Sequence, residues 1–271
     1  MAAVKTLKTE KLTPTVGAEV LDVDVERLLN EDGLPEAVLD ALETNGVLVF
    51  RELNISDDDQ VAFCKRLGEP AIEMMEVSLK PENPLGDILQ GIVEWHMDGT
   101  QDPIPALATV ISARVVADEG GETQFASTYV AYDDLSDEEK ERYANLRVVH
   151  AFAATQRSTH PNPSPETLAL WEQKGSKEHP LVWTHGSGRR SLVLGSSADS
   201  VIGMGEDEGR ALLADLLARA TAPGRVYTHS WSVGDMVMWD NRGMLHRVLA
   251  FDKRSGREMH RTTLVGDEPI Q

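Results

Sequence analysis

The chain has 271 residues, of which 41% are hydrophobic and 26% are charged. This hydrophobic content is enough for a sizeable core and excludes a wholly disordered chain. The net charge of −19, from 45 acidic and 26 basic residues, argues against a partner that is nucleic acid or an anionic membrane surface. Cys64 is the single cysteine, so neither an intrachain disulfide nor a cluster of thiolate metal ligands can form.

The N-terminal sequence lacks the apolar core of a signal peptide, and no apolar run approaches the roughly 20 residues that span a bilayer. We therefore expect a cytoplasmic protein. A chain of 271 residues can form one large domain, and we expect residues 1–271 to do so.

The first part of the chain predicts strands and helices that precede a long loop. Residues 16–25 are typical of a strand followed by a loop, and residues 46–50 (GVLVF) are typical of a buried strand. Between them, the apolar residues of segment 34–42 have helical spacing. Residues 56–68 begin with a capping pattern, Ser-x-x-Asp, and end at a glycine, so they predict a second helix. Residues 81–105 are rich in Pro, Asn and Gly and predict a loop.

The rest of the chain predicts a mainly β architecture with flanking helices. Residues 106–116 form a strong strand candidate that ends at the turn sequence DEGGE. Short strands separated by Gly, Asn or Asp turns are typical of a barrel or a double sheet. We expect the turn at 252–256 to join the last two strands as a hairpin. The predicted helices are 133–145, 165–174 and 206–220, and the predicted final strands are 225–231, 235–239, 244–251 and 257–265.

One short sequence, His96-Met97-Asp98, has the spacing of a metal site. In an extended segment, residues i and i+2 point to the same side, so the imidazole and the carboxylate can bind one ion. An H-x-D pattern is weak by itself, because a loop histidine beside a turn aspartate is common. The facial triad of iron(II) oxygenases needs a third ligand. His246, in a strand-like segment after the WDNRG turn, is the leading candidate, although such a histidine is more often a core residue.

Two arginines follow His246 on the last predicted strand. The strand period places Arg257 and Arg261 on one face, with Met259 between them. Arginine binds carboxylates bidentately and stays charged when desolvated, so the pair is a candidate carboxylate clamp. Either arginine alone could lie on the surface or pair with the many acids, but that alternative is weaker for the whole set.

The order of these motifs resembles the taurine and 2,4-dichlorophenoxyacetate dioxygenase family. It runs from H-x-D through GGET (120–123) and WDNR…H (239–246) to R-x-M-H-R-T-x-L-x-G-D (257–267). The resemblance implies a double-stranded β-helix, a cupin-like jelly-roll barrel, which agrees with the predicted strands. It also implies a dioxygenase that uses Fe(II), 2-oxoglutarate and O2, hydroxylates a small molecule, and releases succinate and CO2.

The resemblance also implies roles for individual residues. The ligands of Fe(II) would be His96, Asp98 and His246. Thr123 and Arg257 would hold the distal carboxylate of 2-oxoglutarate. Arg261 would lie near its C1 carboxylate and within reach of an anionic substrate, and the backbone N–H of Gly99 would face the acidic group of that substrate. The resemblance further suggests a homo-oligomer, either a dimer or a tetramer.

Several positions depart from the taurine-cleaving members of the family. Glu73 stands where those enzymes have a histidine that contacts the sulfonate, and Ala198 stands where they have a bulky aromatic residue. Residues 91–93 (GIV) replace polar residues, and Met97 would add a soft apolar wall. We therefore expect a larger and more apolar acid than taurine, such as an aryloxyalkanoate, an alkyl sulfate or a related sulfonate. Hydroxylation could then lead to C–O or C–S cleavage.

Three alternatives stay open or are disfavoured. Glu73 could pair with a substrate amine or hydroxyl, or it could be merely solvated on a loop. A cupin-like metal-binding protein without turnover would need the metal ligands but would have no use for Thr123 and the two arginines. A serine hydrolase is disfavoured because the chain has no G-x-S-x-G sequence, and Ser187 lacks that spacing.

Overall fold

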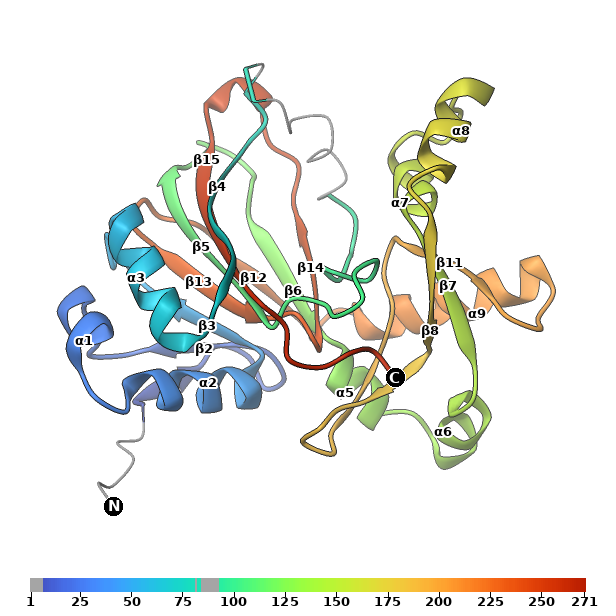
Figure 1. The fold of residues 1–271 in the computed structure, drawn as a ribbon, viewed down its shortest axis with the longest axis horizontal. Helices are drawn as coiled ribbons and strands as arrows, with labels where there is room; N and C mark the ends of the chain where they lie inside the picture. The colour runs from blue at the N-terminus through green and yellow to red at the C-terminus, as the bar shows by residue number, and fades with distance from the viewer. Residues whose placement is uncertain (1–6, 81, 84–92) are drawn as a thin grey trace.

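The largest part of the fold is a seven-stranded sheet, whose labelled strands lie in the left half of Figure 1. The computed structural model describes residues 7–80, 82–83 and 93–271. Neighbouring strands of this sheet are antiparallel, except for the parallel pair β2 and β3. In spatial order the strands are β1 (Thr9–Lys11), β2 (Ala18–Val20), β3 (Val47–Phe50), β13 (Met236–Asp240), β5 (Ala108–Val115), β15 (Glu258–Leu264) and β4 (Pro70–Ser78).

Helices cover the outer face of this sheet, and strand β3 shows why both faces are buried. Successive side chains of a strand point to opposite faces. Leu48 and Phe50 therefore pack in the cluster that contains the helices, whereas Val47 and Val49 pack on the inner face. The covering helices are α1 (Val25–Asn30), α2 (Leu34–Asn45) and α3 (Asp57–Leu67).

A second, three-stranded sheet faces the inner side of the large one. Its order is β12 (Val226–His229), β6 (Thr123–Ser127) and β14 (Met244–Val248). Buried aromatic and apolar side chains from both sheets fill the space between them, among them Phe125, Tyr227, Trp239 and Met259. This arrangement confirms the predicted mainly β, double-sheet architecture.

The predicted hairpin at residues 252–256 is wrong. Strand β14 pairs with β6, and β15 pairs with β5 and β4, so the two strands belong to different sheets. The segment between them contains a short 3-10 helix, η2 (Lys253–Ser255), and carries the chain from one sheet to the other. The turn signal was present in the sequence, but a turn does not decide which strand its neighbours pair with.

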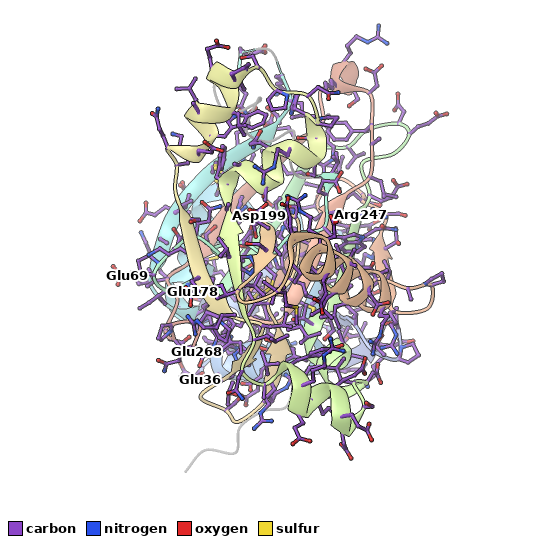
Figure 2. All side chains as sticks on the ribbon, turned by 90° about the vertical axis from the view of Figure 1, so that its right-hand side faces the viewer. Glu36, Glu69, Glu178, Asp199, Arg247 and Glu268 are labelled. Carbon is purple, nitrogen blue, oxygen red and sulfur yellow. The ribbon has the colours of Figure 1, made fainter. Side chains whose placement is uncertain are left out.

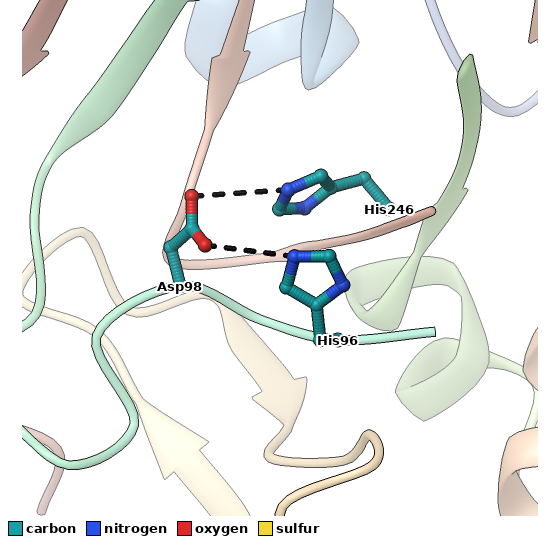
Figure 3. Close-up of side chains that lie close together, drawn as sticks. All are labelled: His96, Asp98 and His246. Carbon is teal, nitrogen blue, oxygen red and sulfur yellow. Dashed lines mark ion pairs between the residues drawn. The ribbon is translucent and has the colours of Figure 1, made fainter. Parts of the chain in front are cut away.

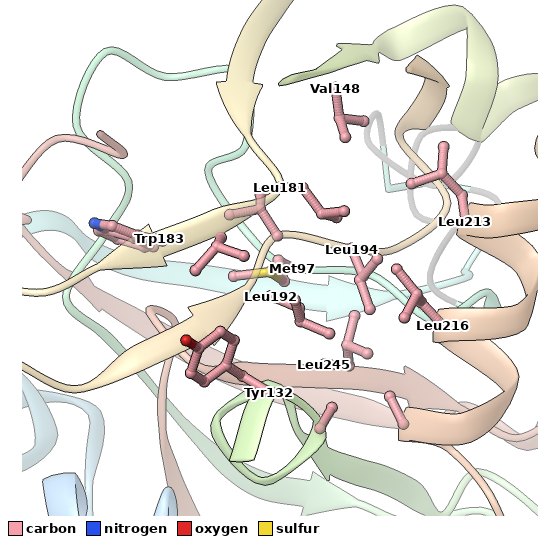
Figure 4. Packing of buried hydrophobic residues seen from close by; sticks show 14 of the residues in the cluster. Met97, Tyr132, Val148, Leu181, Trp183, Leu192, Leu194, Leu213, Leu216 and Leu245 are labelled. Atoms are coloured by element: carbon pink, nitrogen blue, oxygen red, sulfur yellow. The ribbon is translucent and has the colours of Figure 1, made fainter. Parts of the chain in front are cut away.

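A third region, at the right of Figure 1, packs against the second sheet through the cluster in Figure 4. Figure 2 turns this region toward the viewer, with Glu178 of β8 and Asp199 of β11 on its surface. Its strands are β7 (Arg147–Ala151), β8 (Ser176–Pro180), β9 (Val182–Thr184), β10 (Arg190–Leu192) and β11 (Ala198–Val201). The helices after β6 are α5 (Thr128–Asp133), α6 (Asp137–Tyr143), α7 (Phe152–Thr159), α8 (Pro165–Glu172) and α9 (Glu206–Ala220).

Each predicted helix and strand has a counterpart in the structure, but several elements were not predicted, among them β4, β6, α7 and the strands β7 to β11. The helix expected at 133–145 is interrupted, because α5 ends at Asp133 and Ser136 opens α6 with a capping box to Glu139. Strand β4 was not predicted, since most of its side chains are exposed or half-buried and give no clear alternation. Part of the predicted loop at 81–105 lies outside the described residues. Among the helices of the described ranges, none is long and apolar enough to cross a membrane.

Candidate active site

The sequence-predicted triad converges beside β14, as Figure 3 shows. His246 lies within β14, and His96 pairs with it as an isolated antiparallel bridge. The backbone N–H of each histidine donates to the carbonyl oxygen of the other, at 3.0 and 2.9 Å. This bridge holds the two imidazoles together, with ring centroids 4.1 Å apart. Asp98 follows two residues after His96 and returns to the same side, as the extended segment predicts.

The distances within the triad suit a single metal ion. Nε2 of His96 is 3.7 Å from Oδ1 of Asp98, and Nε2 of His246 is 3.8 Å from Oδ2 of Asp98. One candidate ligand atom from each residue lies within 4.8 Å of the others. Imidazole nitrogens and carboxylate oxygens bind metals at about 2.0–2.2 Å, so an ion between these atoms can contact all three.

Hydrogen bonding and charge prepare the three groups as ligands. Nδ1–H of His96 donates to the carbonyl oxygen of Glu94 at 2.8 Å, which leaves the lone pair of Nε2 for a metal. Burial strongly lowers the pKa of His246, so its imidazole is neutral. Burial acts to raise the pKa of Asp98, but attraction to the Arg261 cation, which also donates a hydrogen bond to this carboxylate, is the largest opposing effect and helps to lower this pKa below its ordinary value. Asp98 is thus a carboxylate and His246 a neutral imidazole.

A narrow cavity adjoins the triad and contains a buried arginine. Its lining includes His96 and His246 together with Thr123, Arg257 and Arg261. The side chain of Arg257 lies over the ring of Phe251, and the residue is only 4% exposed. Burial lowers its pKa to about 10, so it is still charged at neutral pH. No carboxylate among the described residues pairs with Arg257, and a buried cation without a partner marks a place for an anion.

Thr123 and Arg261 complete the polar lining. Thr123 begins β6 and is buried, and the indole N–H of Trp231 donates to its Oγ1 at 3.0 Å. Because that bond uses an acceptor position, the hydroxyl hydrogen of Thr123 can be donated to an anion. Arg261 donates from Nη2 to Oδ2 of Asp98 at 2.8 Å and from Nε to Oγ1 of Thr263 at 3.0 Å.

Glu73 is not brought to this site. It lies on strand β4, not on a loop, and forms an exposed 2.6 Å ion pair with Lys65 of α3. The pairing of β4 with β15 shifts register between Met75 and Ile72, which turns Glu73 toward the helix-covered face. A contact between Glu73 and a substrate at the triad therefore has no support in the geometry.

Met97 is also placed elsewhere, and its expected role as a pocket wall is wrong. Successive residues of an extended segment point to opposite sides, so the residue between His96 and Asp98 points away from them. Met97 is buried in the core cluster with Leu192, Leu194 and Leu245, as Figure 4 shows.

Gly99 lies directly after the triad aspartate, whereas Ala198 lines a different cavity. Gly99 follows Asp98 with φ +79°, and a Cβ there would come within 2.8 Å of Cα of Pro105, so the close approach requires glycine. Ala198 is half-buried on β11 and lines a separate cavity of about 470 Å³ with Trp95 and Leu217. Of the segment 91–93, residues 91 and 92 lie outside the described residues.

Sequence reasoning missed Trp231 and Thr109, which contact Thr123 and Asp98. Oγ1 of Thr109 lies 3.5 Å from Oδ2 of Asp98. A threonine or a tryptophan in a predicted strand carries no local signal of such a contact. The first contact arises where β12 pairs with β6, and the second where the segment after the His96–His246 bridge meets β5.

A second polar cluster has the hydrogen bonds of a serine hydrolase triad but cannot act as one. His185 contacts Ser191 Oγ through Nε2 at 2.8 Å and Glu268 Oε1 through Nδ1 at 2.8 Å. Ser191 is fully buried, and its hydroxyl donates to the carbonyl oxygen of Arg242 at 3.1 Å. No substrate can reach a fully buried hydroxyl, so the cluster ties the C-terminal segment to the fold instead.

Comparison with known proteins agrees with this geometry. A family model described as "Taurine catabolism dioxygenase TauD, TfdA family" matches residues 8–263. The chain belongs to this family. The alpha-ketoglutarate-dependent 2,4-dichlorophenoxyacetate dioxygenase of Cupriavidus pinatubonensis is 34% identical to it, over 96% of this chain and 98% of the relative. The (S)-phenoxypropionate/alpha-ketoglutarate-dioxygenase of Sphingobium herbicidovorans is also 34% identical, over 82% of each.

Family membership is also visible in the fold. The crystal structure of AAD-2 in complex with Mn(II) and N-oxalylglycine has a TM-score of 0.88 and 33% identity, and the match covers 98% of this chain and 99% of that one. The predicted family, the jelly-roll fold and the class of enzyme are thereby confirmed. The protein is a metal-requiring dioxygenase that depends on 2-oxoglutarate, the compound also called alpha-ketoglutarate.

Proposed function

We propose that the metal is Fe(II), that the oxidant is O2, and that His96, Asp98 and His246 bind the metal. Two imidazoles and one carboxylate on one side of an ion form the facial triad of non-haem iron(II) oxygenases. The observation that carries the proposal is the combination, in one cavity, of this triad with the buried cation of Arg257, which pairs with no carboxylate of the described residues. A metal-binding protein without turnover has no need for that cation.

In this proposal, the cavity holds 2-oxoglutarate by its two ends. Arg257 and the hydroxyl of Thr123 bind the distal carboxylate, and Arg261 lies toward the C1 carboxylate. Bound iron and 2-oxoglutarate supply the activation of O2, in which 2-oxoglutarate becomes succinate and CO2 while the substrate gains a hydroxyl group. The protein orients the reactants and keeps water out, and the aromatic and apolar lining from Trp239, Val77 and Ile111 serves the second purpose.

For the substrate, we propose a small organic acid with an apolar body, of the aryloxyalkanoate class. The two relatives described above act, by their names, on acids of this kind. The cation of Arg261 and the backbone N–H of Gly99 are suited to an acidic group. Hydroxylation of the carbon next to an ether oxygen gives a hemiacetal, whose collapse breaks the C–O bond.

An activity panel tests this proposal. The protein is reconstituted with Fe(II), ascorbate and 2-oxoglutarate, and succinate release is measured with 2,4-dichlorophenoxyacetate, an alkyl sulfate, taurine and a hydroxylated amine. We expect the aryloxy acid to be turned over best and His246→Ala to be inactive. Preferred turnover of taurine would overturn the substrate class. If O2 uptake never depended on 2-oxoglutarate, the alternative of a cupin-like protein without turnover would be favoured.

We also propose that residues 1–271 form one domain of a cytoplasmic homo-oligomer, a dimer or tetramer, without nucleic-acid or membrane partners. The net charge of −19 supports the absence of polyanionic partners, because nucleic acids and anionic lipids would be repelled. Light scattering of the purified protein measures the oligomeric state, and a monomeric mass would contradict this part of the proposal.

A further inference from the structure

Two fully buried polar residues, Thr109 and Asn241, form a hydrogen-bonded chain that leads to Asp98 of the triad. Thr109 is on β5, where it pairs with Trp239 of β13 on one side and with Thr263 of β15 on the other. It shares the inner face of the sheet with Ile111, which lines the triad cavity. Asn241 follows β13 directly, and its backbone N–H donates to the carbonyl oxygen of Leu107 at 3.1 Å.

The neighbours of Thr109 determine where its hydroxyl hydrogen points. Nδ2 of Asn241 donates to Oγ1 of Thr109 at 3.0 Å, and Nη2 of Arg261 donates to the same oxygen at 3.2 Å. A threonine hydroxyl offers two acceptor positions and one hydrogen. The guanidinium and the amide NH2 can only donate, so both acceptor positions are taken. The hydrogen is left for the third neighbour, Oδ2 of Asp98 at 3.5 Å.

The two carboxylate oxygens of Asp98 therefore differ in their hydrogen bonding. Oδ2 accepts from Arg261 at 2.8 Å, faces the hydroxyl of Thr109 and lies 3.8 Å from Nε2 of His246, whereas Oδ1 accepts no hydrogen bond from the described residues and lies 3.7 Å from Nε2 of His96. We infer that Thr109, with its hydrogen directed by Asn241, is a positioning residue that holds Oδ2 of Asp98 and leaves Oδ1 for the metal. The inference rests on the metal site of the proposed function.

Arg261 also donates a hydrogen bond to Oδ2 of Asp98. In the proposed function the same guanidinium lies toward the C1 carboxylate of 2-oxoglutarate, which competes with Asp98 for its N–H groups. Thr109 sits on β5 in a fully buried position, so its contact with Asp98 does not depend on the co-substrate. The orientation of the aspartate is thereby kept while the arginine changes partner.

Titration with Mn(II) alone tests the inference, because it needs neither substrate nor turnover. The variants are Thr109→Val, which removes the hydroxyl at nearly constant shape, and Thr109→Ser, which keeps it. Outer-sphere partners of metal ligands typically contribute 10- to 100-fold in metal affinity. We expect the Kd for Mn(II) to rise roughly 10-fold or more in Thr109→Val and by less than about threefold in Thr109→Ser. Asn241→Leu, which frees the hydroxyl to rotate, should raise it about fivefold.

Thr262→Val is the matched control, because Thr262 is a fully buried threonine of β15 whose hydroxyl donates to the carbonyl oxygen of Glu73, on the opposite face. It should bind Mn(II) like the wild type. The inference is overturned if Thr109→Val binds like the wild type, or if Thr109→Ser binds as weakly as Thr109→Val. Thr109→Ala replaces Thr109→Val under the same criteria if circular dichroism shows that the latter does not fold. A wild type that binds no Mn(II) would instead refute the proposed metal site.

Discussion

Replacing Arg257 by methionine should change stability and co-substrate binding in opposite directions. Arg257 is buried and, among the described residues, has no carboxylate partner. Methionine has a similar length and no charge, so it fills the space without the cost of burying a cation. If Arg257 exists to bind an anion, the ligand-free protein should gain stability from this change while 2-oxoglutarate binding is lost.

The pKa shift of Arg257 gives the expected change in stability, and the usual cost of losing a buried charge partner gives the expected change in binding. Burial lowers the pKa of Arg257 from 12.5 to about 10, which corresponds to roughly 3 kcal/mol of unfavourable burial of its charge. The lost contact with the ring of Phe251 offsets about 0.5–1 kcal/mol of this. We therefore expect the ligand-free variant to be about 1–3 kcal/mol more stable. Loss of a buried charge partner costs about 2–5 kcal/mol of binding, so the Kd for 2-oxoglutarate should rise at least about 30-fold.

Urea unfolding in the presence of Mn(II), with and without 2-oxoglutarate, measures both effects. At 100 times its wild-type Kd, 2-oxoglutarate should stabilise the wild type by about 2.7 kcal/mol, whereas Arg257→Met, with a Kd at least about 30-fold higher, should gain at most about 0.9 kcal/mol. Arg254→Met is the control, because Arg254 lies close by in the sequence but is exposed and pairs with Asp252. If Arg257→Met is less stable than the wild type and 2-oxoglutarate stabilises it as strongly as it stabilises the wild type, the assigned role of Arg257 is refuted.

Three further predictions concern Trp231, Glu73 and Asp235. Trp231→Phe removes the donor to Thr123, so the Kd for 2-oxoglutarate should rise about fivefold with kcat unchanged; an unaltered Kd in calorimetry would contradict this. Glu73→Gln should leave kcat/KM within about twofold, because an exposed pair with Lys65 contributes at most about 1 kcal/mol; a larger loss would restore Glu73 as a substrate contact. Burial would raise the pKa of Asp235, but hydrogen bonds from a histidine and two backbone amides lower it to about 2. Its stabilising effect of roughly 2 kcal/mol is present above about pH 4 and is lost toward pH 2, and Asp235→Asn should abolish that part of the acid dependence in urea unfolding.

The sequence alone was sufficient for the chemistry of the site. His96 and Asp98 are two residues apart in an extended segment, and a period of two must place them on one side. The same period places Arg257 and Arg261 on one face of β15. His246 was only the leading candidate for the third ligand until the resemblance to the family strengthened it, because no local rule connects positions 150 residues apart.

Only the tertiary structure decided which strands are neighbours, and several residues depended on that. The turn at 252–256 predicted a hairpin, yet the segment joins two sheets, and this places Arg257 opposite the triad. Glu73 points toward α3 because β4 has an irregular register, which no sequence pattern revealed.

Local geometry therefore places the side chains of His96 and Asp98 on one side of their segment. Long-range strand pairing determines which residues surround them. Local periodicity acts over two to four residues, so the sequence alone determines which side chains share a face. The pairing of β5 with β15 brings Thr109 and Arg261 together, and the bridge between His96 and His246 places Asp98 beside them. Which groups orient the triad was for that reason decided by the fold.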